Sequence, residues 1–177
     1  VFADRQISNS YFYELLSLDG YQKILNDAIW SIQNKREMRL VEVGYDYTCI
    51  PQTVAYPIDF LPLQILYHRG VIHLSGIVKG KNKILAIALN QLKKYSLTNN
   101  MFDNRDLLAA LRREMDNRFG ITNNMNNEIY DIEIEFSELT GEFVKHHFWH
   151  HSQNFSKLST GNYVMTLRCG INRELVG

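Results

Sequence analysis

The sequence of 177 residues has little cysteine, little proline and no long apolar run. Its two cysteines, Cys49 and Cys169, lie far apart and form no Cys-x-x-Cys pair, which excludes a disulfide framework and the usual cysteine-based zinc sites. It also has no run of eighteen apolar residues and no N-terminal signal pattern. These absences predict a soluble, cytoplasmic protein that does not enter a membrane.

The motifs of common enzyme classes are missing as well. The sequence contains no glycine-rich phosphate loop, no Gly-x-Ser-x-Gly elbow and no paired carboxylates in an apolar setting. Ser152 follows His151, but adjacent residues rarely face each other in the geometry that nucleophilic catalysis needs. We therefore predict a protein that is not an enzyme and has no cofactor.

What the sequence does contain is a dense group of histidines. Four of its six histidines fall within one stretch, at His146, His147, His150 and His151. At a helical spacing of four they form two pairs, each able to offer nitrogen ligands to zinc. A zinc site needs three or four ligands, and Phe148 and Trp149 stand where zinc hydrolases carry a glutamate base. A zinc-dependent hydrolase is thus the weaker alternative to solvated or helix-terminal histidines.

Charge is balanced overall but unevenly distributed. The chain has 19 Lys and Arg against 19 Asp and Glu. Residues 36–98 carry eight basic and four acidic side chains, a net charge of +4, whereas residues 128–177 carry four and seven, a net charge of −3. The middle of the chain could therefore meet an anionic partner that the end would repel.

Hydrophobic periodicity divides the chain into helical and extended parts. A stripe at three- and four-residue spacing predicts a helix over 20–35, with a shorter one over 10–18. From Met38 the period changes to two, and strand-like runs follow over 53–60, 63–68, 71–78 and 84–89. Five short strands in about fifty residues predict a small, strongly bent barrel or roll.

The second half begins with a helix over 104–118 that closes at Phe119-Gly120. The asparagine-rich segment 121–127 is expected to be a linker. Beyond it, strands over 130–136, 155–158 and 163–169, with helices over 137–149 and from Asn172, give a split β-α-β-β-α order. The domains predicted are 1–35 (linker helices), 36–98 (small barrel), 99–127 (helix and linker) and 128–177 (extension). A start at Val1 and a stop just after a helix start suggest a fragment of a longer protein.

An ordered set of features resembles the WYL domain of bacterial transcriptional regulators together with its C-terminal extension. The features are Pro57 with its following strand, Gly70 to Gly76, Ile87 to Leu92, Phe119-Gly120, Trp149 to Gln153, Gly161 and Glu174-Leu175. The resemblance covers roughly residues 22–177, and its strength lies in the order of the features.

The resemblance implies an α+β fold: a helix, a small Sm-like or SH3-like β-barrel, a helical linker and a ferredoxin-like βαββα extension. It also implies an effector-sensing and dimerisation region, with a nucleic acid, a nucleotide or another small molecule as ligand. DNA would be bound through a winged-helix domain that this chain lacks, and the expected partner is a second copy in a homodimer.

The resemblance also points to candidate ligand-binding residues, which are Tyr45, His73, Arg69 and Lys83. A strand tyrosine is more often a packing group, and a lone histidine in an alternating strand is more often a partly exposed surface group. Lysine-rich turns are commonly solvated. Leu85 and Gln91 stand where the family has arginines that could contact phosphate in a bidentate manner. Their presence favours the alternative of a structural dimerisation module that has lost its ligand.

Overall fold

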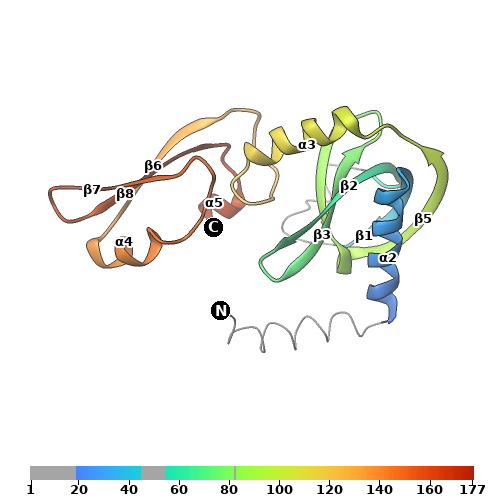
Figure 1. Cartoon of the computed structure of the whole chain (residues 1–177), viewed down its shortest axis with the longest axis horizontal. Helices are drawn as coiled ribbons and strands as arrows, with labels where there is room; N and C mark the ends of the chain where they lie inside the picture. The colour runs from blue at the N-terminus through green and yellow to red at the C-terminus, as the bar shows by residue number, and fades with distance from the viewer. Residues whose placement is uncertain (1–18, 45–54, 82) are drawn as a thin grey trace. The chain divides into compact units, whose positions relative to one another are not determined.

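This computed structural model contains helices and antiparallel strands, and it describes residues 19–44, 55–81 and 83–177 (Figure 1). The α+β class predicted from the sequence is confirmed. The chain divides into two units between Leu111 and Arg112. No helix in the described ranges has both the length and the apolar character that a membrane span requires. The segment 10–18, for which a helix was predicted, lies outside the described residues. So do Tyr45 and Cys49.

The described part of the first unit consists of one helix and a five-stranded antiparallel sheet. Helix α2 (Asp19–Gln33) precedes the sheet, and its apolar stripe supplies Tyr21 and Ala28 to the core. The strands lie in the order β4-β3-β2-β1-β5. Their bounds are β1 (Arg36–Val43), β2 (Ile58–His68), β3 (Val71–Val78), β4 (Lys83–Ala88) and β5 (Leu92–Met101).

A very short connection forces this sheet to curve. Strands β4 and β5 form its two edges but are joined by the three residues of the 3-10 helix η2 (Leu89–Gln91). From Ala88 to Leu92 the chain reaches about 14 Å at most. The edges of a flat five-stranded sheet would be about 19 Å apart. The sheet is therefore rolled, and because β4 and β5 do not pair within the described residues, it is an open roll rather than a closed barrel.

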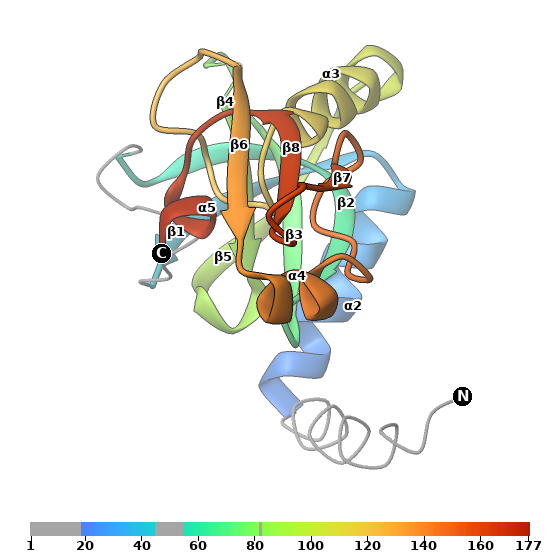
Figure 2. The same cartoon turned by 90° about the vertical axis from the view of Figure 1, so that its left-hand side faces the viewer.

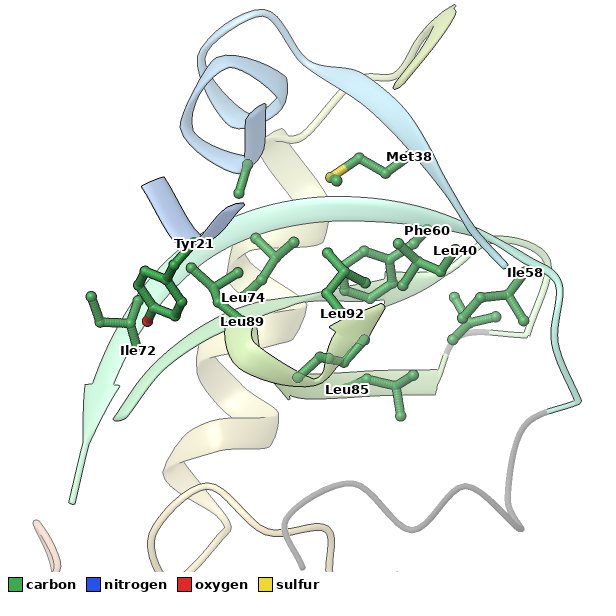
Figure 3. Packing of buried hydrophobic residues seen from close by; sticks show 13 residues of the cluster. Tyr21, Met38, Leu40, Ile58, Phe60, Ile72, Leu74, Leu85, Leu89 and Leu92 are labelled. Carbon is green, nitrogen blue, oxygen red and sulfur yellow. The ribbon is translucent and has the colours of Figure 1, made fainter. Parts of the chain in front are cut away.

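The inside of the roll holds the main apolar core (Figure 3). Met38, Leu40, Phe60, Leu74 and Leu89 are each fully buried there. They come from β1, β2, β3 and η2, so the cluster draws on strands far apart in the sequence. Ile24, Leu25 and Ile32 of α2 pack against the same cluster, which places the helix over the interior of the roll.

Two of the five predicted strands differ in the structure. The runs 53–60 and 63–68 were predicted as separate strands, but Ile58–His68 is a single strand that passes through Pro62. The register shifts between Pro62 and Gln64, and such an irregularity is where a sheet accommodates proline. Strand β5 was not predicted, because its lysines and asparagines lack an apolar alternation. It is nevertheless fixed by its pairing with β1.

The second unit contains the predicted β-α-β-β-α order. After α3 (Arg105–Asp116), in which the division between the units falls, come β6 (Tyr130–Phe136), α4 (Glu138–Val144), β7 (Asn154–Lys157), β8 (Tyr163–Cys169) and α5 (Arg173–Val176). Strands β6 and β7 flank β8 and are both antiparallel to it, so they are parallel to each other (Figure 2). Phe119, Met165, Leu167 and Cys169 are the buried residues of this unit's core.

The start of the asparagine-rich segment 121–127, which was expected to be a linker, is packed into the second unit, whereas residues 125–127 are exposed. Ile121 and Thr122 are buried, and the Glu174 carboxylate accepts hydrogen bonds from both of their backbone N–H groups, at 2.9 and 2.8 Å. Asn172 Nδ2 donates to the carbonyls of Phe119 and Thr122 at 2.9 and 3.0 Å. Polar side chains from near the end of the chain, Asn172 and Glu174, therefore satisfy the buried backbone groups at the start of this segment.

We expect Gly76→Ala to destabilise the first unit strongly. A Cβ at Gly76 would lie 2.1 Å from the backbone oxygen of Leu61 in β2, opposite the bulge, and 2.8 Å from the Phe60 ring. Because backbone cannot move aside cheaply, the free energy of unfolding should fall by about 1–3 kcal/mol. Urea unfolding of both proteins measures the change.

Gly20→Ala is the matched control, since a Cβ there has no heavy atom within 4 Å. It should leave stability unchanged or raise it by up to about 1 kcal/mol, because alanine favours helix. Equal effects of the two substitutions would contradict the close approach of β2 and β3 at Gly76.

Candidate functional site

The histidine stretch lies just beyond α4, not on it. The helix was predicted to run to about Trp149, but it ends at Val144. The pairs at helical spacing therefore do not share one helical turn, which corrects the geometry assumed for a metal site. His147 Nδ1 instead lies 2.8 Å from the carbonyl oxygen of Phe143, so its N–H caps the last turn of α4. The Trp149 indole N–H donates to the Val144 carbonyl at 3.1 Å in the same way.

His150 forms the buried centre of this corner, with only 4% of its surface exposed. Its Nε2 lies 2.9 Å from the carbonyl oxygen of Asp116, the last residue of α3. Since a carbonyl only accepts, Nε2 carries the proton, and Nδ1 accepts from the backbone N–H of Ser152 at 3.2 Å. The Ser152 hydroxyl lies 2.7 Å from Nδ1, to which it can donate its proton. Its oxygen accepts from the backbone N–H of Arg168 in β8 at 2.8 Å. His150 thus links the end of α3 to β8.

Gln153 fixes the turn that holds this histidine. Its Oε1 accepts from the backbone N–H groups of Trp149 and His150 at 2.6 and 2.9 Å, and its Nε2 donates to the His147 carbonyl at 2.8 Å. The residues Trp149 to Gln153 that carried part of the family resemblance are therefore bound mainly to backbone. They specify the shape of a corner.

The described part of the chain contains no set of side chains that could bind a metal ion. No group of three or more His, Cys, Asp or Glu side chains there is arranged to hold a metal ion. Two of the four clustered imidazoles are bound to backbone carbonyls. The Cys169 thiol is buried, which raises its pKa and keeps it protonated at neutral pH. Among the described residues the zinc hydrolase alternative therefore has no ligand set, and no contact there explains the exposed His146.

In the first unit, the candidate residues His73 and Arg69 lie on the β2–β3 hairpin. Arg69 and Gly70 form its turn with φ of 48° and 80°, the two positive values of a type I′ connection. His73 is only 2% exposed, which contradicts the expectation of a partly exposed surface group. Its Nδ1 lies 3.1 Å from the Val71 carbonyl, and its ring meets that of His68 edge-on at 6.4 Å.

Lys83 lies far from these two residues. It pairs with Val78 at one end of the β3–β4 ladder, whereas His73 pairs with Ala88 at the other. The two pairs are five residues apart along the strands, which corresponds to a distance of about 17 Å. The structure therefore does not bring Lys83 and His73 into one cluster, and Tyr45 lies outside the described residues.

The basic turn between β3 and β4 is partly neutralised by a carboxylate that the sequence analysis missed. Glu37 of β1 has a side chain only 3% exposed, and its Oε1 lies 2.5 Å from Lys79 Nζ. Its Oε2 accepts from Asn100 Nδ2 at 3.2 Å. A single acid among the apolar and basic residues of the first half of β1, from Arg36 to Leu40, was the available signal. Arg39 and Asp59 form a second, exposed pair at 2.8 Å. These pairs reduce the positive field that the net charge of residues 36–98 suggested.

Comparisons with known proteins identify no family. No family description matches the chain, and no curated protein matches it. Among solved structures it is similar to proteasome accessory factor B/C (PafBC) of Arthrobacter aurescens, with 10% sequence identity and a TM-score of 0.43. That likeness covers 85% of this chain but only 21% of PafBC. A likeness at this level of identity and score assigns neither a family nor an activity.

We expect the His150 contacts to make stability depend on pH. Burial lowers the pKa of His150, with the neighbouring His151 acting in the same direction and the bond to the Asp116 carbonyl opposing it. As the pH falls below about 6.5, the unfolded chain takes up a proton before the folded one does, so stability falls with acidification. Protonation would also turn Nδ1 from acceptor to donor and break its bond from Ser152.

His150→Gln should therefore unfold at lower urea concentration at neutral pH and lose part of the decline in stability between about pH 7 and 5. His146→Gln, at an exposed histidine of the same stretch, is the control and should keep the wild-type pH profile. Identical profiles for the two variants would show that His150 does not carry this dependence.

Proposed function

We propose that this chain is the sensing and dimerisation region of a WYL-type transcriptional regulator. Its rolled sheet would be the Sm-like or SH3-like barrel of that family, and its second unit the ferredoxin-like extension. The regulator would bind DNA through a domain outside this sequence. A ligand that favours one dimer arrangement would then shift the population of DNA-binding states.

The observation that carries this proposal is the order of the architecture along the chain. A helix, a rolled antiparallel sheet whose fifth strand returns to the first, a helix and a split β-α-β-β-α unit follow one another. Two of the sequence features that carry the family resemblance lie between these elements. Phe119-Gly120 follows α3, and the turn from Trp149 to Gln153 lies between α4 and β7.

The ligand site of this regulator would lie on the hairpin side of the roll, around Arg69. Arg69 is exposed at the tip of the β2–β3 turn, where its guanidinium could reach phosphate. A nucleotide or a short single strand of nucleic acid is the ligand class that such a cation and the net positive charge of residues 36–98 favour.

A second candidate function is a dimerisation module without a ligand, and the position of Leu85 favours it. Leu85 is 3% exposed and belongs to the apolar core. A buried apolar side chain thus stands where the family has an arginine. Gln91 accepts the N–H of Gly44 through its carbonyl at 2.7 Å and packs against that glycine. Neither residue offers the bidentate contact to phosphate that arginine makes.

Titration with a short oligothymidylate and with ATP, at about 50 and about 200 mM salt, separates the two candidates. The sensing function predicts binding that weakens as salt rises. Arg69→Asn should weaken it and lower the salt slope by about 0.7, the contribution of one contact to a single strand. Asparagine tolerates the positive φ at this turn, so the variant removes the cation and keeps the hairpin.

Arg112→Gln, at an exposed position of α3, is the charge-matched control and should bind like the wild type. Absence of binding at low salt would refute the nucleic-acid and nucleotide ligands. A dimer in sedimentation without any such binding would then support the structural module, and a monomer at all concentrations would contradict both candidates.

A further inference from the structure

We infer that the outward face of helix α4 is the surface through which two copies of this chain pair, with the two helices antiparallel across a two-fold axis. The inference rests on the dimer of the proposed function and names the surface that forms it. Three features of the helix carry it: its exposed apolar side chains, their direction relative to the sheet, and the charges along its length.

Helix α4 exposes two large apolar side chains on one face. Leu139 is 73% exposed and Phe143 is 68% exposed. Residues four apart lie next to each other on a helix surface, so the two form one apolar patch. Phe148, which is 80% exposed, follows soon after the helix ends at Val144. Single exposed apolar residues need no explanation, whereas apolar side chains gathered on one helix face mark an interaction surface.

Gly141 fixes the direction in which this patch points. A Cβ at Gly141 would overlap the ring of Tyr163 in β8, so this side of α4 lies on the sheet. Each residue of a helix turns by about 100°, which places Leu139 and Phe143 on the side of α4 opposite Gly141. The patch therefore points away from the sheet. A strand at either edge of this sheet, or a helix beside α4 on the same face, would contact the flanks of α4 rather than the patch.

The charges along α4 make this surface complementary to itself. Glu138 and Glu142 stand in the helix, and Lys145 is its C-cap. In an antiparallel pair with Leu139 of each copy opposite Phe143 of the other, Glu138 of each copy lies close to Lys145 of the other. A parallel pair would instead set Glu138 against Glu138, and like charges repel. The charge pattern thus favours a second copy in the antiparallel orientation.

Ion pairs surround the apolar patch. Lys157 Nζ lies 2.8 Å from Glu138 Oε1, and Lys145 Nζ lies 2.6 Å from Glu142 Oε2. All four of these side chains are partly exposed. Across the two-fold axis the pairs of the two copies would join into a rim of alternating charge. An apolar centre with a polar rim is the usual anatomy of a protein interface.

The area of the surface fits a reversible dimer. At their exposures, Leu139, Phe143 and Phe148 each present roughly 150 Å² to water, which makes about 450 Å² in each copy. A standard interface buries about 800 Å² of each partner. The three side chains therefore supply about half of that area, which is close to the apolar share of a typical interface.

Sedimentation of the chain over a range of concentrations tests the inference. The wild type should dimerise reversibly, and Phe143→Glu should raise the dissociation constant at least about tenfold, because it places a charge in the apolar centre. Met125→Glu, at another exposed apolar residue of the same unit, is the matched control and should dimerise like the wild type. Since both side chains are exposed, urea unfolding of the monomers should give the same stability for both variants as for the wild type.

Charge reversal tests the antiparallel orientation. Glu138→Lys and Lys145→Glu should each weaken the dimer at least about threefold, because each sets like charges against one another across the axis. An equimolar mixture of the two variants should form a heterodimer about as tight as the wild-type dimer, because each reversed charge then meets its opposite.

A wild-type dimer that Phe143→Glu leaves unchanged would overturn this inference and leave the dimer of the proposed function in place on another surface. A wild-type monomer at all concentrations would overturn both. Equal effects of Phe143→Glu and Met125→Glu, or no recovery in the mixture of charge variants, would also overturn the assignment of the dimer to α4.

Discussion

The short connection between β4 and β5 is the constraint on which the first unit depends. Three residues cannot span the width of a flat five-stranded sheet, so the two edge strands must approach each other. The resulting roll encloses Met38, Leu40, Phe60 and Leu74, and α2 lies over its interior. Close packing inside the roll explains why glycine stands at position 76, where β3 passes the backbone of β2.

In the second unit, the need to satisfy buried backbone groups explains several polar side chains, among them His150 of the histidine stretch. His150 bonds the carbonyl at the end of α3, Gln153 holds two N–H groups of its own turn, and Glu174 accepts from the backbone of Ile121 and Thr122. A buried amide or carbonyl without a partner would cost about 1–3 kcal/mol. Imidazole, amide and carboxylate groups at these positions are therefore structural.

The local sequence pattern was sufficient to predict a helix or strand where that element has an apolar face of its own. The helix near 20–35 and the alternating strand from Tyr130 to Phe136 were both predicted from the spacing of their apolar residues. It failed where an element depends on a distant partner. β5 is polar along most of its length and exists because β1 lies beside it, and α4 ends early because the residues after Val144 turn to cap it. The candidate ligand-binding residues do not lie together for the same reason, since the register of β3 and β4 places His73 and Lys83 at opposite ends of their ladder.

The sequence alone determined the class of the fold, the order of the elements in the second unit and the acidic alternation of β6, because these follow from periodicity and residue type within short windows. Only the tertiary structure decided that the sheet rolls without closing, that Glu37 neutralises Lys79, and that the histidine stretch is a corner bound to backbone. Each of those features joins residues far apart along the chain. A contact of that kind has no local signal, because it forms only when packing brings the two partners together.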